Sequence, residues 1–364
     1  MRSFTRAATA FVAFLALGVS AQAQAPEGYP ADYAKVIDAA KKEGKVVVYA
    51  TTDAAVANPL IKDFEKLYGI TVEYSDLNST ELYNRYIAEV AAGSGTADVV
   101  WSSAMDLTLK LVSDGRAETY ASPETPNLPK WAIYQNQAYG TTYEPITFVY
   151  NKRLVPAEDL PQDHEALLKL LTAKPDAYKG KITAYDPERS GVGYFFVNED
   201  VKNFPKAWDL FNAFGKSEIK LYTSAGAMME RVTSGEHLIA YGIFGSYALA
   251  RAKKDPNLGI ILPKDYTMVT SRVAFISKGG KNPNAAKLFL DYILSERGQD
   301  IVANQADLYS LRNDVEGEAT VKRVTELVGS NVKPVAIDAE LLKGLDQTTR
   351  LKFLRQWQTA MKSH

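Results

Sequence analysis

Residues 46–101 alternate between strand patterns and helix patterns, and this alternation constrains the fold more than any other feature of the sequence. Val46-Val47-Val48-Tyr49 is a run typical of a buried strand, and residues 70–74 and 98–101 repeat it. Between them, apolar side chains recur at helical spacing, first from Pro59 and then after an Asn78/Glu81 pair typical of a helix start. Strand–helix–strand order predicts parallel strands joined by right-handed crossovers. The fold class is therefore α/β.

A second set of α/β patterns follows the Pro-, Asn- and Tyr-rich segment 122–143. A strand over 146–150 precedes it, and its expected strands are residues 181–185, 219–222 and 238–244. A strand over 273–277 and a helix over 285–293 come next. No Gly/Ser-rich linker separates the two sets. Two lobes joined by strands rather than by a flexible tether suggest a hinged cleft.

The N-terminal segment has the pattern of a secretory signal peptide. Arg2 and Arg6 precede the uncharged apolar run 7–19, and Ala21-Gln22-Ala23 has the small-x-small pattern of a cleavage site. Ala23-Gln24-Ala25 is an equally good site. About thirteen apolar residues fall short of the roughly twenty that a membrane-spanning helix needs. We therefore expect residues 1–23 to be removed and the mature protein to work in the periplasm of a host with two membranes.

Charge and composition exclude several classes of function. The 42 Lys and Arg residues balance 43 Asp and Glu residues, without a dense basic block, so nucleic acid is not an expected partner. The chain has no cysteine, which excludes a Cys nucleophile and Cys-ligated metals. An exported hydrolase would have to use His164 or His237, but neither belongs to a nucleophile elbow or a zinc-binding pair. We expect no enzyme activity, no cofactor and no metal site.

Several short motifs, taken in order, resemble bacterial extracellular solute-binding proteins. They are the exported start, the strand 46–49 with its Thr-rich turn, Ala97-Asp98-Val99-Val100-Trp101, Thr233-Ser234-Gly235-Glu236, residues 282–289 running into 295–299, Lys333-Pro334-Val335 and Phe353-Leu354-Arg355-Gln356-Trp357. The resemblance covers essentially the whole mature chain. It is closest to the branch that includes ferric-iron, hexose-phosphate, phosphoglycerate and aminoethylphosphonate binders of ABC importers.

This resemblance implies a fold, a partner and a mode of action. The fold would be a two-lobed, type 2 Venus-flytrap fold with two hinge crossovers, near residues 142–150 and 268–273. We expect residues 24–145 and 271–312 in lobe 1, and residues 146–270 and 313–364 in lobe 2. The protein would act as a monomer that closes on a small-molecule ligand and delivers it to the membrane permease of an ABC importer. A ligand-binding partner of a sensor would differ only in its docking surface.

The candidate ligand-binding residues lie mainly in turns between a predicted strand and a helix. Helix N-termini offer free N–H groups and a positive dipole end, and small hydroxyl side chains add donors, so such turns suit an anion carrying phosphate, phosphonate or carboxylate. The ordinary alternative for each is a helix cap. The turn residues are Thr51, Thr52, Ser79, Thr80, Ser102, Ser103, Ser190, Gly191, Thr223 and Ser224.

Four larger residues complete the candidate site. Arg189 offers a bidentate fork for an anion, and Arg272 lies near the second expected crossover, where a hinge ion pair is the alternative. Tyr241 and Phe244 could wall the ligand or be buried in the sheet. In the ferric binders that the sequence resembles, two adjacent tyrosines follow the Ser-Gly-Glu turn, whereas this chain has Phe244 and Gly245 there. Ferric iron is therefore the alternative ligand rather than the expected one.

Overall fold

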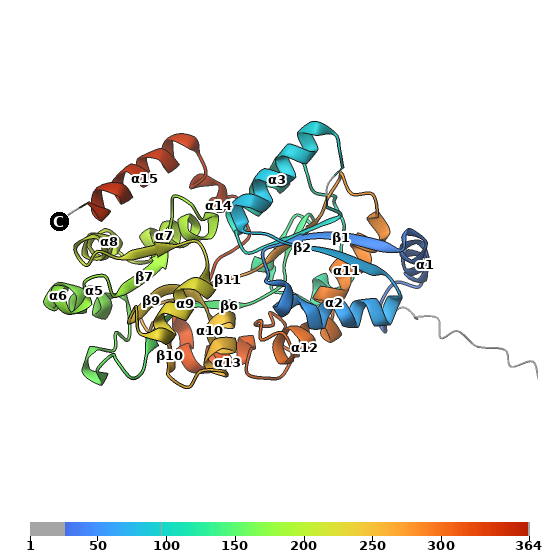
Figure 1. The fold of residues 1–364 in the computed structure, drawn as a ribbon. Helices are drawn as coiled ribbons and strands as arrows, with labels where there is room; N and C mark the ends of the chain where they lie inside the picture. Colours follow the sequence, from blue (N-terminus) through green and yellow to red (C-terminus); the bar gives the residue numbers. More distant parts are fainter. Residues whose placement is uncertain (1–25, 96, 363–364) are drawn as a thin grey trace, which may run out of the picture.

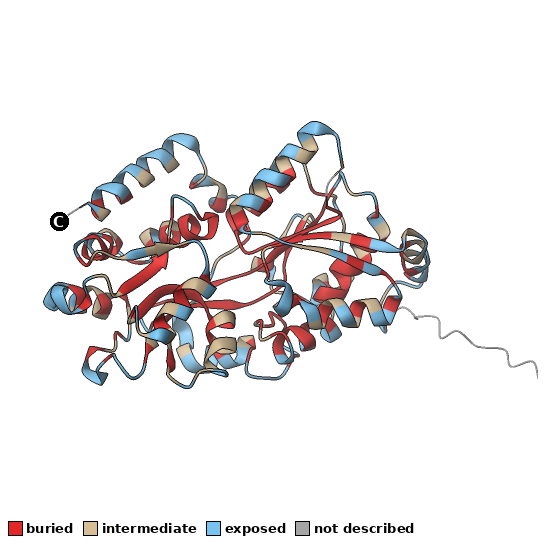
Figure 2. Cartoon of the chain, in the orientation of Figure 1, coloured by how far each residue is buried: buried red, intermediate tan, exposed pale blue. Residues whose placement is uncertain are grey.

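The computed structural model describes residues 26–95 and 97–362 as two α/β lobes side by side (Figure 1). The expected signal peptide and both of its possible cleavage sites lie outside these residues. Figure 2 shows the buried residues concentrated along the strands and on the helix faces turned toward them. The α/β class expected from the sequence is confirmed.

The first lobe is built around a sheet with the strand order β2-β1-β3-β12-β5-β4. β1 pairs in parallel with β2 and β3, as the strand–helix alternation predicts, whereas β12 is antiparallel to both β3 and β5. The strands are β1 (Lys45–Ala50), β2 (Thr71–Asp76), β3 (Val99–Ser102), β4 (Ile133–Tyr134), β5 (Ala138–Gly140) and β12 (Val273–Ile276). The helices of this lobe are α1 (Ala34–Glu43), α2 (Ala54–Tyr68), α3 (Ser79–Ala92), α4 (Met105–Ser113), α11 (Pro283–Leu294) and α12 (Glu296–Asn304).

Local sequence explains where the helices of this lobe begin and end. The Asn78 side chain accepts a hydrogen bond from the Glu81 N–H at 2.9 Å and caps α3, as expected. α1, α2 and α3 each end at a glycine in the left-handed conformation. The expected start of α2 at Pro59 is wrong, because the helix begins at Ala54, whose N–H donates to the Asp76 carboxylate. Pro59 therefore lies inside the helix.

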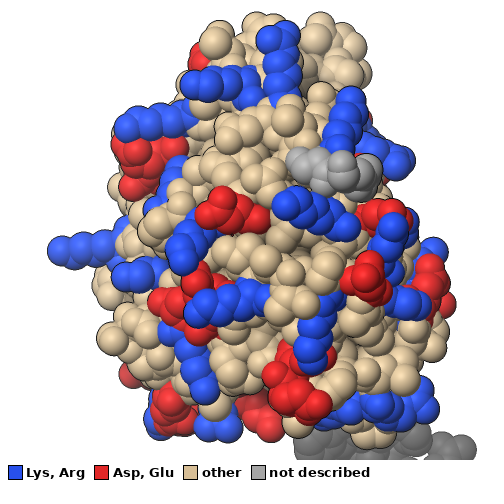
Figure 3. Space-filling model, turned by 90° about the vertical axis from the view of Figure 1, so that its left-hand side faces the viewer, with Lys and Arg blue, Asp and Glu red and all other residues tan. Residues whose placement is uncertain are grey.

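The second lobe is built around a sheet with the order β13-β11-β6-β9-β7-β8, and β10 also pairs with β6. Its strands are β6 (Glu144–Asn151), β7 (Ile182–Tyr185), β8 (Lys220–Tyr222), β9 (Ile239–Phe244), β10 (Leu258–Ile261), β11 (Thr267–Thr270) and β13 (Val332–Pro334). The helices that follow β6 are α5 (His164–Ala173), α6 (Pro175–Tyr178), α7 (Gly191–Asn203), α8 (Ala207–Lys216), α9 (Ala225–Ser234) and α10 (Gly245–Ala252). Figure 3 shows acidic and basic side chains interspersed over the end face of this lobe.

Two adjacent segments carry the chain between the sheets. Residues 141–143 connect β5 to β6, and residues 271–272 connect β11 back to β12. They are hydrogen-bonded to each other: the Thr141 N–H donates to the Arg272 carbonyl at 2.9 Å, and the Arg272 N–H donates to Thr142 Oγ1 at 2.8 Å. The expected two-lobed fold with paired hinge crossovers is therefore present.

The C-terminal part returns to the second lobe through elements that touch both lobes. It contains α13 (Val321–Val328), α14 (Glu340–Lys343) and α15 (Gln347–Met361). Val324 of α13 packs with the apolar core of the first lobe, β13 pairs with β11, and α15 packs on α8. The lobe boundaries expected from the sequence stay a prediction.

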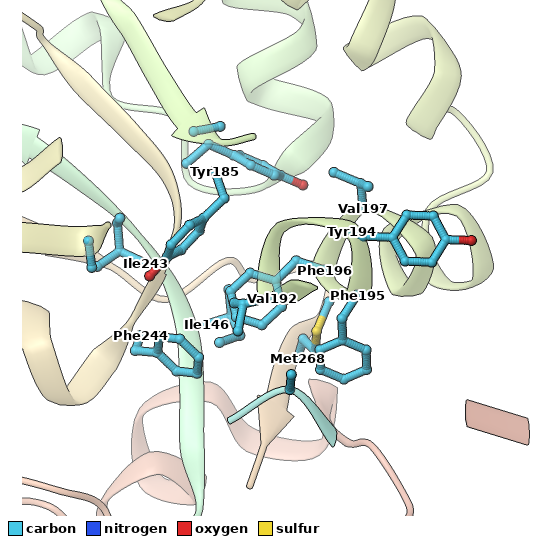
Figure 4. Close-up of a cluster of buried hydrophobic side chains, with 14 of the residues drawn as sticks. Ile146, Tyr185, Val192, Tyr194, Phe195, Phe196, Val197, Ile243, Phe244 and Met268 are labelled. Carbon is cyan, nitrogen blue, oxygen red and sulfur yellow. The ribbon is translucent and has the colours of Figure 1, made fainter. Parts of the chain in front are cut away.

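Two clusters of buried apolar residues form the hydrophobic cores that stabilise the lobes. One lies on the side of the first sheet that α1, α2 and α11 cover. The other starts beneath α3 and α4 on the first lobe and continues through the second lobe, where Tyr185, Phe196 and Phe244 form part of an aromatic cluster (Figure 4). Of the helices that the structure describes, none has the length and the apolar character needed to cross a membrane.

Candidate binding site between the lobes

A cavity of about 230 Å³ lies between the two lobes. The first lobe contributes the ends of β1, β2 and β3 with the residues that follow them, and the second lobe contributes the corresponding ends of β7, β8 and β9. This is the edge at which open α/β sheets bind ligands. The lining residues are Thr51, Asp53, Asp76, Leu77, Asn78, Ser79, Ser103, Tyr185, Ser190, Val192, Thr223, Ser224, Ala225, Gly226, Phe244 and Tyr247.

Helix N-termini from both lobes converge on this cavity. Residues that begin or directly precede α2, α3, α7, α9 and α10 all belong to its lining. Ser190 caps α7 by accepting from the Gly193 N–H, and Ser224 caps α9 by accepting from the Ala227 N–H. These hydroxyl groups are thus helix caps as well as lining residues. The dipoles of the converging helices give the cavity several positive ends.

The two lobes touch directly beside the cavity. The N–H groups of Gly191 and Val192, at the start of α7, donate to Thr80 Oγ1 at 3.2 Å and Ser79 Oγ at 3.3 Å. A second contact runs from the Tyr247 hydroxyl to Asp53 Oδ1 at 3.3 Å. Because the first donors of a helix have no partner inside it, the opposite lobe satisfies two of them only when the cleft is closed. The structure is therefore a closed form.

The closed form depends on close approach at Gly191, and this gives a first prediction. A Cβ atom there would lie 2.7 Å from Leu107 Cδ1 and 3.1 Å from Ser79 Oγ, both on the first lobe. Gly191→Ala should therefore disfavour closure and weaken ligand binding about tenfold or less, because the end of the Leu107 side chain can move. Calorimetric titration measures the loss. Unchanged affinity would show that this contact does not govern closure.

Charge in the lining is negative. Among the residues that the structure describes, Asp53 and Asp76 are the only charged side chains that line the cavity, and both are exposed. Asp76 Oδ2 accepts from the Ala54 N–H at 2.9 Å, and Asp53 accepts from Tyr247. The described lining thus has helix N-termini on both lobes, two carboxylates on the first lobe and no basic side chain on either.

A buried ion pair lies in the hinge, behind the Phe244 and Tyr247 side chains that line the cavity. Arg272 Nε is 2.7 Å from Glu144 Oε1, and both side chains are buried. Arg272 Nη1 also donates to Thr52 Oγ1 at 3.0 Å. Its guanidinium carbon lies 5.5 Å from the ring centroid of Phe244 and 5.3 Å from that of Tyr247. Arg272 therefore holds the hinge together and does not face the cavity. A hinge ion pair was the alternative that the sequence left open.

The structure brings seven of the predicted residues into the lining. They are Thr51, Ser79, Ser103, Ser190, Thr223, Ser224 and Phe244. Thr80 and Gly191 lie beside the cavity, where they hydrogen-bond to each other across the lobes. Their contact with a ligand stays a prediction.

Five other predicted residues lie outside the lining. Thr52, Ser102 and Arg272 are buried behind it, whereas Arg189 is exposed and its predicted bidentate contact gains no support from its position. Tyr241 lies in the core, stacked on Phe148 with its hydroxyl donating to Asp200 Oδ2 at 2.7 Å. Burial in the sheet, the alternative for Tyr241, is what the structure shows.

Sequence reasoning missed Asp53, Asp76, Tyr185 and Tyr247. The position between a strand and a helix, which selected the hydroxyl residues, could also have selected the two acids, since Asp53 precedes α2 and Asp76 ends β2. Their negative charge made them poor candidates for an anion site. Tyr185 and Tyr247 carry no local signal that distinguishes them from the other tyrosines.

A metal site lacks support in this cavity. Within residues 26–95 and 97–362, no group of three His, Asp or Glu side chains is placed to hold a metal ion. Burial raises the pKa of the Tyr185 phenol and that of the Tyr247 phenol, so both are neutral in the protein without a metal ion.

The lobe contact also contains a titratable group, which gives a second prediction. Asp106 of α4 is buried in the helix that packs on α7 and α14 of the second lobe, and burial raises its pKa to about 7. A raised pKa means that the stabilising contribution is complete below the unfolded value, near 4, and is lost as the pH rises through about 7. The unfolding free energy of the parent should therefore decrease between pH 5 and pH 8, and in Asp106→Asn this decrease should be smaller by roughly 2 kcal/mol. Urea denaturation at both pH values measures this, and parallel curves for the variant and the parent would contradict it.

Comparison with known proteins gives a consistent family match. A protein-family model described as a bacterial extracellular solute-binding protein matches residues 59–327. The chain is similar to the substrate binding protein of the ABC transporter from Agrobacterium tumefaciens, with a TM-score of 0.83 and 36% identity over 87% of this chain and 94% of that one.

Two further solved structures share the fold at lower identity. AfuA from Actinobacillus pleuropneumoniae, solved with exogenous fructose-6-phosphate, has a TM-score of 0.72 and 21% identity. The match covers 88% of this chain and 100% of the AfuA chain. Iron-bound HitA from Pseudomonas aeruginosa has a TM-score of 0.71 and 21% identity over 87% of this chain and 99% of its own. At such identities the likeness shows the fold alone.

Proposed function

Because the chain belongs to the family of bacterial extracellular solute-binding proteins, we propose that it is the solute-binding component of an ABC importer. In this role it works in the periplasm, closes its two lobes around a small organic solute and delivers the solute to a membrane permease. The family binds solutes and is not enzymatic, in agreement with the sequence analysis. The similar protein from Agrobacterium tumefaciens is itself described as the substrate binding protein of an ABC transporter.

The observation that carries this proposal is the cavity itself. It is lined by both lobes, it lies at the carboxyl ends of the strands, and the two crossing segments beside it form a paired hinge. A ligand that contacts both lobes stabilises the closed form in proportion to its preference for that form. Capture by hinge closure follows from this arrangement.

The solute carries an anionic group, which the second lobe binds. Ala225 and Gly226 begin α9 and line the cavity, so their backbone N–H groups lie among the first donors of a helix. Thr223 and Ser224 are exposed beside them. Phosphate, phosphonate and carboxylate groups all suit such a site.

A thermal-unfolding screen of the mature protein tests the proposal. The panel contains phosphate monoesters, phosphonates, carboxylates with and without amino groups, neutral sugars and ferric citrate. We expect one class of organic acid to raise the melting temperature, because a ligand that binds only the folded state stabilises it by mass action. Stabilisation by ferric citrate alone would favour iron transport, and no stabilisation by any small solute would contradict the proposed function.

Importer and sensor can be separated in the source bacterium. Deletion of the gene should abolish uptake of the stabilising solute in radiolabelled form, and expression of the protein should restore it. Normal uptake in the deletion strain, together with a lost transcriptional or chemotactic response, would assign the protein to a sensor.

A further inference from the structure

We propose that the first lobe carries a second ligand site, which binds a small organic ammonium ion with an apolar part. The site is a cavity of about 420 Å³ between residues 26–33, the end of α2 and the corner between α11 and α12. Among the described residues, none lines both this cavity and the one between the lobes. α1, α2 and α11 lie at the end of the molecule away from the second lobe (Figure 1), so the site is separate from the hinged cleft.

A buried carboxylate without a counter-ion lies in the lining. Asp291 of α11 is only 1% exposed, and burial raises its pKa to about 6, so it is ionised at neutral pH. In the described part of the chain, its hydrogen-bond donors are all neutral hydroxyl groups, at 2.5–2.6 Å, those of Tyr33, Tyr120 and Ser122. Buried charges in proteins are normally paired, so this carboxylate favours a cation in the cavity.

The two arginines of the lining already have other acidic partners. Arg297 binds Asp63 through two hydrogen bonds of 2.7 Å. Arg312 is paired with Glu124 at 2.5 Å and with Asp314 at 2.5 Å, so one guanidinium serves two carboxylates. Neither arginine compensates the charge of the buried aspartate. An entering cation would therefore reduce an excess of negative charge.

Tyr68 points to a ligand independently of these charges. Its side chain is 7% exposed and lines the cavity, yet its hydroxyl forms no hydrogen bond with any residue that the structure describes. Burial and the nearby charge of Asp291 raise the pKa of this phenol to about 12, so it is protonated and lies within electrostatic reach of the unpaired carboxylate. Because buried hydroxyl groups normally have partners, the free oxygen is suited to accept an N–H from a bound ammonium group.

Four tyrosine rings in the lining favour an organic cation over a metal ion. Tyr29 and Tyr33 meet edge to face with their centroids 4.6 Å apart, and Tyr68 and Tyr292 do so at 6.4 Å. Ring faces attract organic ammonium groups. Leu67, 36% exposed, lies in the same lining and can contact the apolar part of the ligand. The described chain offers no group of three acidic or histidine side chains for a metal ion.

Matched probes test this site in the mature protein. They are butylammonium and 2-phenylethylammonium, each compared with the alcohol that carries hydroxyl in place of the amino group. Titration followed by ligand-detected NMR should show each ammonium ion binding about tenfold or more tightly than its alcohol, because only the ammonium ion adds charge attraction. Asp291→Asn should weaken ammonium binding at least about tenfold, whereas Asp38→Asn, an exposed acid on α1 outside the lining, should leave it unchanged.

Tyr68→Phe provides a second test that does not depend on removing a buried charge. The variant loses only a hydroxyl without a described partner, so the fold should be retained. It should weaken butylammonium binding about threefold to tenfold and leave butyltrimethylammonium binding unchanged, since that ion has no N–H to donate. Circular dichroism of both variants checks folding, and Tyr68→Phe decides alone if Asp291→Asn does not fold.

Gly226→Trp separates this site from the cavity between the lobes, which an indole at Gly226 would fill. It should abolish binding of the transported solute and leave the affinity for the ammonium probes unchanged. The second site is overturned if no ammonium probe binds, if the alcohols bind as tightly, if the folded variants at Asp291 and Tyr68 keep the parent affinity, or if Gly226→Trp abolishes ammonium binding. None of these results affects the proposed function, which depends on the cavity between the lobes.

Discussion

Gly226→Trp should abolish solute binding while leaving the fold intact. Gly226 is the second residue of α9, is exposed and lines the cavity. A Cβ atom at this position would meet only Ser224 Oγ, at an ordinary 3.5 Å, so the helix accepts a side chain. An indole would occupy much of a cavity of about 230 Å³ and keep the lobes apart. We expect affinity to fall at least about a hundredfold, or roughly 2.7 kcal/mol.

The matched control for this variant is Gly226→Ala, which adds a methyl group without filling the cavity. Calorimetry on the solute found by thermal screening should give an affinity within about threefold of the parent for alanine and no measurable binding for tryptophan. If the tryptophan variant binds as tightly as the parent, the solute does not bind in this cavity.

Arg272→Met should destabilise the protein by about 3–5 kcal/mol, because it leaves the Glu144 carboxylate buried and uncompensated. The two side chains are 1% and 0% exposed, so water cannot replace the lost partner. Burial alone would lower the pKa of Arg272, but the adjacent Glu144 carboxylate outweighs this effect and raises the pKa, which keeps the guanidinium charged. Urea denaturation of the parent and the variant measures the loss.

The double variant Arg272→Met/Glu144→Gln supplies the control for the hinge ion pair. With both charges removed, most of the lost stability should return, since buried ion pairs are often replaceable by neutral side chains. The amide introduced by Glu144→Gln would keep an acceptor for the Thr142 hydroxyl, which now donates to Glu144 Oε1 at 3.1 Å. If the double variant is as unstable as Arg272→Met, the loss arises from packing rather than from an unpaired charge.

Local patterns were sufficient to predict the main elements of the fold. The apolar run 46–49 lies in β1, and the predicted strands over 146–150 and 238–244 correspond to β6 and β9. The Asn78 cap of α3 follows from its side-chain chemistry alone. β4, β5, β10, β11 and β13, by contrast, were not predicted as strands, because short strands owe their conformation to a neighbouring strand that sequence does not identify.

The candidate site could be predicted only in part. Helix-start chemistry selected Ser79, Ser190 and Ser224, which line the cavity, because the sheet fixes the position of the turns that follow its parallel strands. It could not show that Arg189 is exposed, since the direction of a side chain beside a turn depends on tertiary packing. Nor could it find the partner of Arg272, since Glu144 is 128 residues away in the sequence.

The central claim is that a solute holds the two lobes closed around this cavity. Small-angle X-ray scattering of the mature protein, before and after saturation with the solute that stabilises it most, tests the claim directly. The radius of gyration should decrease on saturation to the value calculated for the closed structure, in which Gly191 contacts Thr80 across the lobes. An unchanged radius at saturating ligand, under conditions where calorimetry shows the site to be occupied, would contradict capture by hinge closure.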